Sequence, residues 1–114
     1  MKINGIDVTF NVFDTNERQT FNDAFIEVSY KAKKLEGRLE NSLISQQEYQ
    51  KKQIKLIKKF LKKILSIEKS QLLIETCSDY EDYYKVFETI TQMVCTTIAL
   101  VNKAMQSRKK IDSE

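Results

Sequence analysis

The chain contains almost no residues that interrupt a helix. Its 114 residues include no proline and only two glycines, Gly5 and Gly37. Proline breaks a helix because it lacks the backbone N–H donor, and an interior glycine costs about 1 kcal/mol relative to alanine. We therefore expect long helices whose ends are set by capping residues rather than by helix breakers.

The first residues are the exception, because they carry the pattern of a β-strand with one buried face. The apolar residues that alternate there with polar ones are Ile6, Val8, Phe10 and Val12. The Asn4-Gly5 pair that precedes them tolerates the positive φ angles of a type I′ turn. This pattern predicts a hairpin over residues 1–13, with its second strand running from Ile6 to Phe13.

Three long helices are predicted after the hairpin, over residues of about 15–39, 46–67 and 79–108. Each begins at a capping-box spacing, in which a side-chain oxygen accepts a hydrogen bond from a free amide of the first turn. The pairs are Asp14 with Glu17, Ser45 with Glu48 and Ser78 with Glu81. Residues 70–77 fit either a short helix or a buried extended segment, and residues 109–114 are predicted to be a frayed tail.

The apolar residues of each predicted helix recur three, four or seven positions apart, as one buried face requires. The stripe of the last helix consists of Tyr83, Phe87, Ile90, Val94, Thr97, Ile98, Val101 and Met105. We therefore expect a mainly α (α+β) fold, formed as a single domain over residues 1–114. In it, an N-terminal β-hairpin is followed by three long antiparallel helices, of which the last is long enough to extend beyond the core.

The residue types present argue against catalysis. The chain has no histidine, so it lacks an imidazole to shuttle protons near neutral pH or to bind a metal. Two glycines cannot build the phosphate cradle of a nucleotide site. Cys77 and Cys95 lack the spacing of a zinc site, and Cys95 is expected to be a buried thiol. We expect no enzymatic activity, no cofactor, no metal and no membrane span, and the lack of a signal peptide points to a reducing cytosol.

Charge is distributed unevenly along the chain. Residues 46–69 hold eight lysines and two glutamates, for +6, whereas residues 70–107 hold two lysines and five acidic residues, for −3. The lysines expected opposite the apolar stripe of the second helix are Lys51, Lys52, Lys55, Lys58, Lys59, Lys62 and Lys63. They form either a solvated helix face or a surface for an anionic partner. Nucleic acid is disfavoured because the cluster lacks arginine and interleaved aromatics, and a membrane surface because Phe60 is the single aromatic anchor.

A cluster of acidic and tyrosine residues marks the predicted start of the last helix. Rigid amphipathic rings beside acidic groups are frequent at binding surfaces. The alternative is that Tyr83 covers the core while the acidic residues cap the helix and face the lysine-rich end of the second helix. The candidate partner-binding residues are therefore Lys51, Lys55, Lys58, Lys59, Lys62, Asp79, Tyr80, Glu81, Asp82 and Tyr84.

The order of these features resembles a known class of viral protein. It consists of the opening MKINGIDVTFNVFD, a lysine-rich second helix and a final YEDYYKVFETITQMV that ends in NKAMQSRKK. In this order the chain is similar to small phage and prophage proteins of low-GC Gram-positive bacteria that look like tail assembly chaperones. The resemblance implies a non-enzymatic protein that binds the tape measure or tail tube protein in the host cytoplasm. It also implies contacts through Tyr80, Tyr84 and the lysine face.

Two other functions stay open at this point. A phage-encoded inhibitor of a host defence system, such as an anti-CRISPR protein, would use the acidic, tyrosine-rich start of the last helix to bind a protein. A nucleic-acid-binding accessory protein would use the lysine-rich helix, and its affinity would fall steeply with salt. The residue pattern leaves open both the identity of the partner and whether the chain forms a homo-oligomer.

Overall fold

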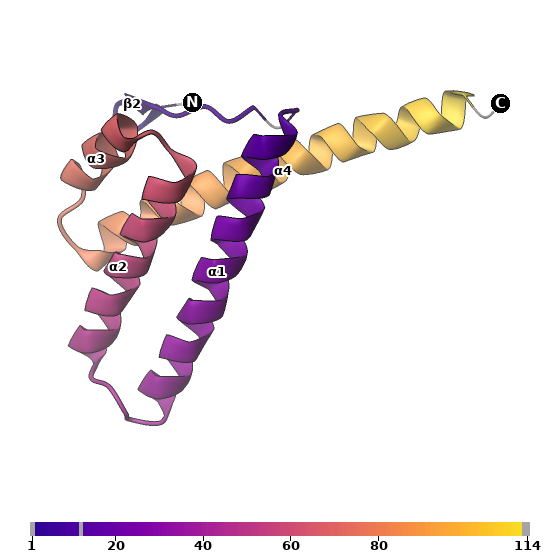
Figure 1. The fold of residues 1–114 in the computed structure, drawn as a ribbon. Helices are drawn as coiled ribbons and strands as arrows, with labels where there is room; N and C mark the ends of the chain where they lie inside the picture. Colours follow the sequence, from indigo (N-terminus) through magenta and orange to yellow (C-terminus); the bar gives the residue numbers. More distant parts are fainter. Residues whose placement is uncertain (1, 12, 113–114) are drawn as a thin grey trace.

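The computed structural model describes residues 2–11 and 13–112 (Figure 1). Within these residues, a two-stranded antiparallel hairpin precedes four helices. The elements are β1 (Lys2–Ile3), β2 (Ile6–Asp7), α1 (Thr15–Glu40), α2 (Gln46–Ile64), α3 (Ile67–Glu75) and α4 (Tyr80–Asp112). The predicted mainly helical fold with an N-terminal hairpin is confirmed, and α3 is an additional helix that was not predicted as such.

The hairpin turns where the sequence predicts it. Asn4 and Gly5 both have positive φ angles, of 52° and 83°, as the central residues of a type I′ turn require. The second strand ends at Asp7 rather than at Phe13, because the short first strand offers it only two partners. The predicted alternation nevertheless continues beyond the paired residues, since Val8 is fully buried. Val12 lies outside the described residues.

Helices α1 and α2 begin at the predicted caps. The Asp14 side chain accepts hydrogen bonds from the backbone N–H groups of Asn16 and Glu17. The Ser45 hydroxyl accepts one from Glu48 at 3.1 Å. Each of these bonds satisfies a first-turn amide that has no partner within its own helix. The start of α1 and the start of α2 are therefore both confirmed.

Helix α2 ends at Ile64, earlier than predicted, and a new helix starts almost at once. Leu65 and Ser66 adopt extended backbone angles. The Ser66 hydroxyl then accepts a hydrogen bond from the backbone N–H of Lys69 at 3.2 Å and so caps α3. The segment 70–77, for which helix and extended chain were both open, is helical through Glu75. The break was missed because a lysine occupies the position of the usual capping-box glutamate.

Helix α4 differs from its prediction at both ends. Asp79 rather than Ser78 is its N-cap, because the Asp79 carboxylate accepts from the backbone N–H of Asp82 at 3.0 Å. Asp82 in turn accepts from both the backbone N–H and the hydroxyl of Ser78. The helix continues to Asp112, so residues 109–112 are helical rather than a frayed tail. No proline or glycine stands there to stop it, and residues 113–114 lie outside the described residues.

The long helices are not all antiparallel. α1 and α2 run side by side in opposite directions, whereas α4 crosses behind both of them (Figure 1). Aromatic contacts fix this crossing, because the Phe87 ring centroid lies 5.0 Å from that of Phe60 on α2 and 6.5 Å from that of Phe25 on α1. The antiparallel arrangement predicted for three helices therefore holds for α1 and α2 alone.

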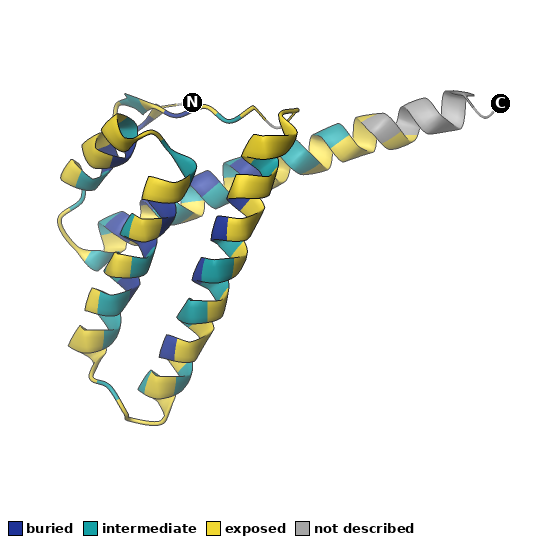
Figure 2. Cartoon of the chain, in the orientation of Figure 1, coloured by how far each residue is buried: buried dark blue, intermediate teal, exposed yellow. Residues whose placement is uncertain are grey.

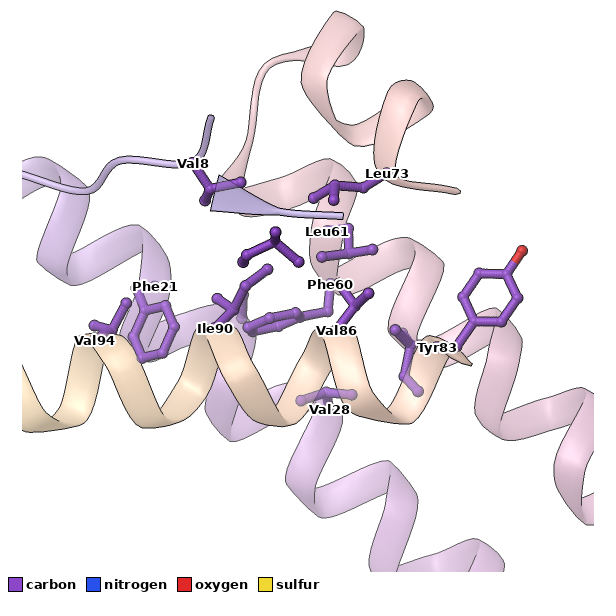
Figure 3. Packing of buried hydrophobic residues seen from close by; sticks show 13 residues of the cluster. Val8, Phe21, Val28, Phe60, Leu61, Leu73, Tyr83, Val86, Ile90 and Val94 are labelled. Atoms are coloured by element: carbon purple, nitrogen blue, oxygen red, sulfur yellow. The ribbon is translucent and has the colours of Figure 1, made fainter. Parts of the chain in front are cut away.

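The core lies where the hairpin and the four helices meet. Its members include Val8 from the hairpin segment and Leu73 from α3, which close the end of the helical layer (Figure 3). The largest fully buried side chains among the described residues belong to Phe60, Leu61, Leu73 and Ile90. Because a two-stranded hairpin is unstable alone, its apolar face depends on this helical support.

Candidate functional site

The lysines of α2 do not form one solvent-facing surface. Lys59 and Lys63 turn towards α1, where both bind the carboxylate of Glu27. Lys58 lies on the other flank, with its Nζ atom 5.5 Å from the ring centroid of Tyr83. At 100° per residue the seven lysines cover an arc of about 140° of the helix circumference, and α1 and α4 lie at the two edges of this arc. The expectation that all seven lie opposite the apolar stripe is therefore confirmed, but those at the edges of this face contact neighbouring helices.

Glu27 is the centre of an ionic cluster between α1 and α2. Its carboxylate accepts hydrogen bonds from Lys63, from Lys31 at 2.9 Å and from Lys59 at 3.2 Å. These bonds, that of Lys63 foremost, lower the pKa of Glu27 to about 2. Glu27 raises the pKa of Lys31 in return. Lys59 and Lys63 thus serve to hold two helices together, which is a structural role.

Beside this cluster, a groove runs between α1 and α2. It has a volume of about 320 Å³ and a floor that includes Leu35 and Leu56. The basic side chains that line it are Lys31, Lys34, Arg38, Lys52 and Lys55. We call this feature the basic groove. Of the predicted site residues it contains Lys55 alone. Its other cations come largely from α1, and the charge pattern within one helix does not show which cations of another helix lie beside it.

The remaining predicted lysines stand apart from the groove. Lys51 and Lys62 are exposed on α2, and neither lines the basic groove. The lysine-rich helix therefore divides into a flank that binds α1, a flank that meets α4 and an exposed strip between them. Only the part that faces α1 is combined with a concave surface.

The acidic residues at the start of α4 are engaged in local structure. Asp79 caps the helix. Asp82 accepts hydrogen bonds from the backbone N–H and the hydroxyl of Ser78, and these bonds lower the pKa of Asp82. No ion pair joins Asp79, Glu81 or Asp82 to a lysine within the described residues. The start of α4 lies beside Tyr49, at the start of α2, because α3 reverses the direction of the chain. The interpretation that placed these acidic residues beside the lysine-rich end of α2 is therefore wrong.

The tyrosines of α4 point in different directions. Tyr83 is 6% exposed and belongs to the core, as one of the two interpretations predicted. Tyr80 is half-buried between Tyr49 and Tyr84, with ring centroids 6.5 Å and 6.0 Å away. This burial raises the pKa of the Tyr80 hydroxyl. Tyr84 is exposed, so a small aromatic surface remains at the predicted place.

The second half of α4 leaves the core but keeps its apolar residues. Val94 is buried, whereas Leu100, further along the same helix, is 64% exposed. Beyond the core, the described part of α4 has the colours of intermediate and exposed residues (Figure 2). Ile98 and Val101 are half-buried, and the side chain of Met105 lies outside the described part of the chain. Cys95 is exposed rather than buried, since it lies about 100° around the helix from Val94.

The described residues contain neither a cluster of metal ligands nor a helix suited to span a membrane. No three histidine, cysteine, aspartate or glutamate side chains gather there as a metal site would need. Within the same residues, no helix combines the length and apolar character required to cross a membrane.

The chain matches no protein-family model, no curated protein and no solved structure. Its own surfaces are therefore the guide to its function.

Proposed function

We propose that this chain is a non-enzymatic assembly protein that binds a helical segment of another protein along the second half of α4. The observation that carries the proposal is the apolar stripe that continues after the core has ended. Val94 is 3% exposed, whereas Ile98 and Val101, further along the same side of this unbroken helix, are only half-buried. An apolar helix face that its own chain leaves uncovered is a suitable surface for a partner helix.

The spacing of the stripe fits such a partner. Ile90, Val94, Ile98 and Val101 follow one another at intervals of three or four residues, which aligns them along one side of α4. A second helix laid along this side would pack its ridges between them, as helices do in bundles. At about 25 cal/mol per Å² of apolar surface buried, a few such side chains supply several kcal/mol of binding energy.

The biological setting that agrees with this role is virion assembly. Tail assembly chaperones, which the chain resembles in the order of its sequence features, bind long helical tail proteins. We therefore propose the tape measure or tail tube protein of a phage as the client, in the cytoplasm of the host. The alternative, an anti-CRISPR-like inhibitor that acts through acidic groups, has less support because Asp79 and Asp82 serve as capping groups.

The test is co-expression of the tagged full chain with the products of its neighbouring genes, followed by pull-down and light scattering. Val101→Asp should weaken the complex at least about tenfold, because a charge then enters the apolar contact. Ile26→Asp is the matched control, since Ile26 on α1 is 65% exposed and receives the same charge. Equal capture of the two variants, or no captured partner at all, would contradict the proposal.

A further inference from the structure

The basic groove concentrates positive charge that the fold does not neutralise. Its lining contains five cationic side chains and no acidic one. Among the described residues, Lys31 alone of these five forms an ion pair, with Glu27. Lys34 rests over the ring of Tyr30, 4.6 Å from the centroid. Like charges held close together repel one another, so a negatively charged ligand in the groove would relieve an unfavourable interaction.

The floor of the groove narrows the class of ligand. Leu35 is buried and Leu56 is half-buried between the two rows of cations. A single-stranded nucleic acid would neutralise the cations but would also need aromatic faces for its bases, and no aromatic side chain lines the groove. An acidic peptide with an apolar side chain would use both the charged walls and the apolar floor.

The size of the groove agrees with a peptide anchor. Its volume of about 320 Å³ lies at the lower end of the range of about 300–1,000 Å³ that ligand pockets occupy. This space accommodates one large apolar side chain with the acidic groups on either side of it. We propose that the basic groove binds an acidic segment of a partner protein, which inserts a leucine-sized side chain between its carboxylates.

This site is separate from the surface of the proposed function. The groove lies towards the loop that joins α1 and α2, whereas the second half of α4 leaves the fold near the first turns of α1 (Figure 1). A partner at one site therefore leaves the other accessible. The groove proposal does not depend on what α4 binds, and each proposal fails or stands on its own variants.

The experiment measures binding of fluorescent probes to the full chain by anisotropy. The first probe is a short glutamate peptide with a leucine at every fourth position. The second has alanine in place of each leucine, and the third is a single-stranded DNA of the same charge. Binding is measured at about 50 mM and about 150 mM salt, because screening weakens contacts between exposed charges.

Two charge-reversal variants locate the site. Arg38→Glu with Lys55→Glu places two negative charges in the groove, at positions that are exposed and make no ion pair within the described residues. Lys51→Glu with Lys62→Glu changes the net charge equally but outside the groove. The groove variant should bind the leucine peptide at least about tenfold more weakly, because two attractions are lost and two repulsions are added. The affinity of the control variant for this peptide should fall less than about threefold.

The outcomes separate the possible occupants of the groove. The proposal is supported if the leucine peptide binds more tightly than both other probes and if only the groove variant has a reduced affinity for this peptide. It is overturned if the DNA binds as tightly as the leucine peptide, if leucine and alanine peptides bind alike, or if both variants lose binding equally. Absence of any binding at about 50 mM salt overturns it as well. Circular dichroism of both variants verifies that they remain folded.

Discussion

Replacing Leu73 by alanine should destabilise the protein strongly, whereas the same change at Leu72 should not. Leu73 of α3 is fully buried against the hairpin segment and α2, while its neighbour Leu72 is 43% exposed. Truncation of a fully buried leucine removes its apolar contacts and leaves a cavity, at a cost of about 3 kcal/mol. Leu72→Ala removes a side chain that is already largely hydrated and introduces a strong helix former, so about 1 kcal/mol or less should be lost.

These free energies convert into a clear difference in melting temperature. Unfolding entropy is about 2.1 cal/mol/K per residue, which gives about 0.24 kcal/mol/K for a chain of 114 residues. Leu73→Ala should therefore lower Tm by about 12 °C and Leu72→Ala by about 4 °C or less. Urea unfolding followed by far-UV circular dichroism gives the same comparison at constant temperature, with an unchanged m-value if the unfolded state is unaffected.

The pair of variants tests the rotation of α3 about its axis. Both changes are leucine to alanine on one short helix, so propensity and chemistry are matched. If Leu72→Ala costs as much as Leu73→Ala, or more, then the side of α3 that faces the core has been assigned incorrectly. A cost below about 1 kcal/mol at Leu73 would likewise refute its place in the core.

Two further predictions concern titratable groups. The folded pKa of Glu27 is about 2, below its ordinary 4.5, so its stabilising effect is complete above pH 4.5 and is lost as the pH falls towards about 2. Glu27→Gln should reduce the dependence of the urea unfolding midpoint on pH over this range. The same pH dependence in the variant and the original protein would contradict the ionic cluster. Cys95 is exposed, whereas burial raises the pKa of the half-buried Cys77. In the folded chain a thiol reagent should therefore modify Cys95 first, as mass spectrometry of the Cys95→Ser variant would verify.

The acidic residues of α4 illustrate how a functional pattern and a structural one coincide in sequence. Asp79 and Asp82 stand next to tyrosines, as residues of a binding surface often do. In the structure Asp79 accepts a hydrogen bond from the backbone N–H of Asp82 in the first turn, and Asp82 accepts one from the backbone N–H of Ser78 before the helix. Such bonds satisfy the free N–H groups at a helix N-terminus. Of the three acidic candidates, Glu81 alone has no hydrogen bond of this kind within the described residues. The aromatic part of the cluster, at Tyr84, is the part that remains available to a partner.

Local chemistry made several features predictable from the sequence alone. The turn at Asn4 and Gly5 and the helix starts at Asp14 and Ser45 depend on backbone angles and hydrogen bonds within a few residues. The extent of α1 was also predictable, because the interior Gly37 is a minor cost within a helix that has a continuous apolar stripe. Such features are set by local interactions, although the Asn4 side chain also donates a hydrogen bond to the Thr76 hydroxyl at 3.0 Å.

Tertiary structure decided what the lysines and the last helix can do. The break after Ile64 creates α3, and α3 reverses the chain so that α4 crosses α1 and α2 instead of running alongside them. Packing of α1 against α2 then assigned Lys59 and Lys63 to Glu27 and combined Lys55 with cations of α1 in one groove. Periodicity shows which residues of a helix share a face, but only packing determines which neighbour that face meets.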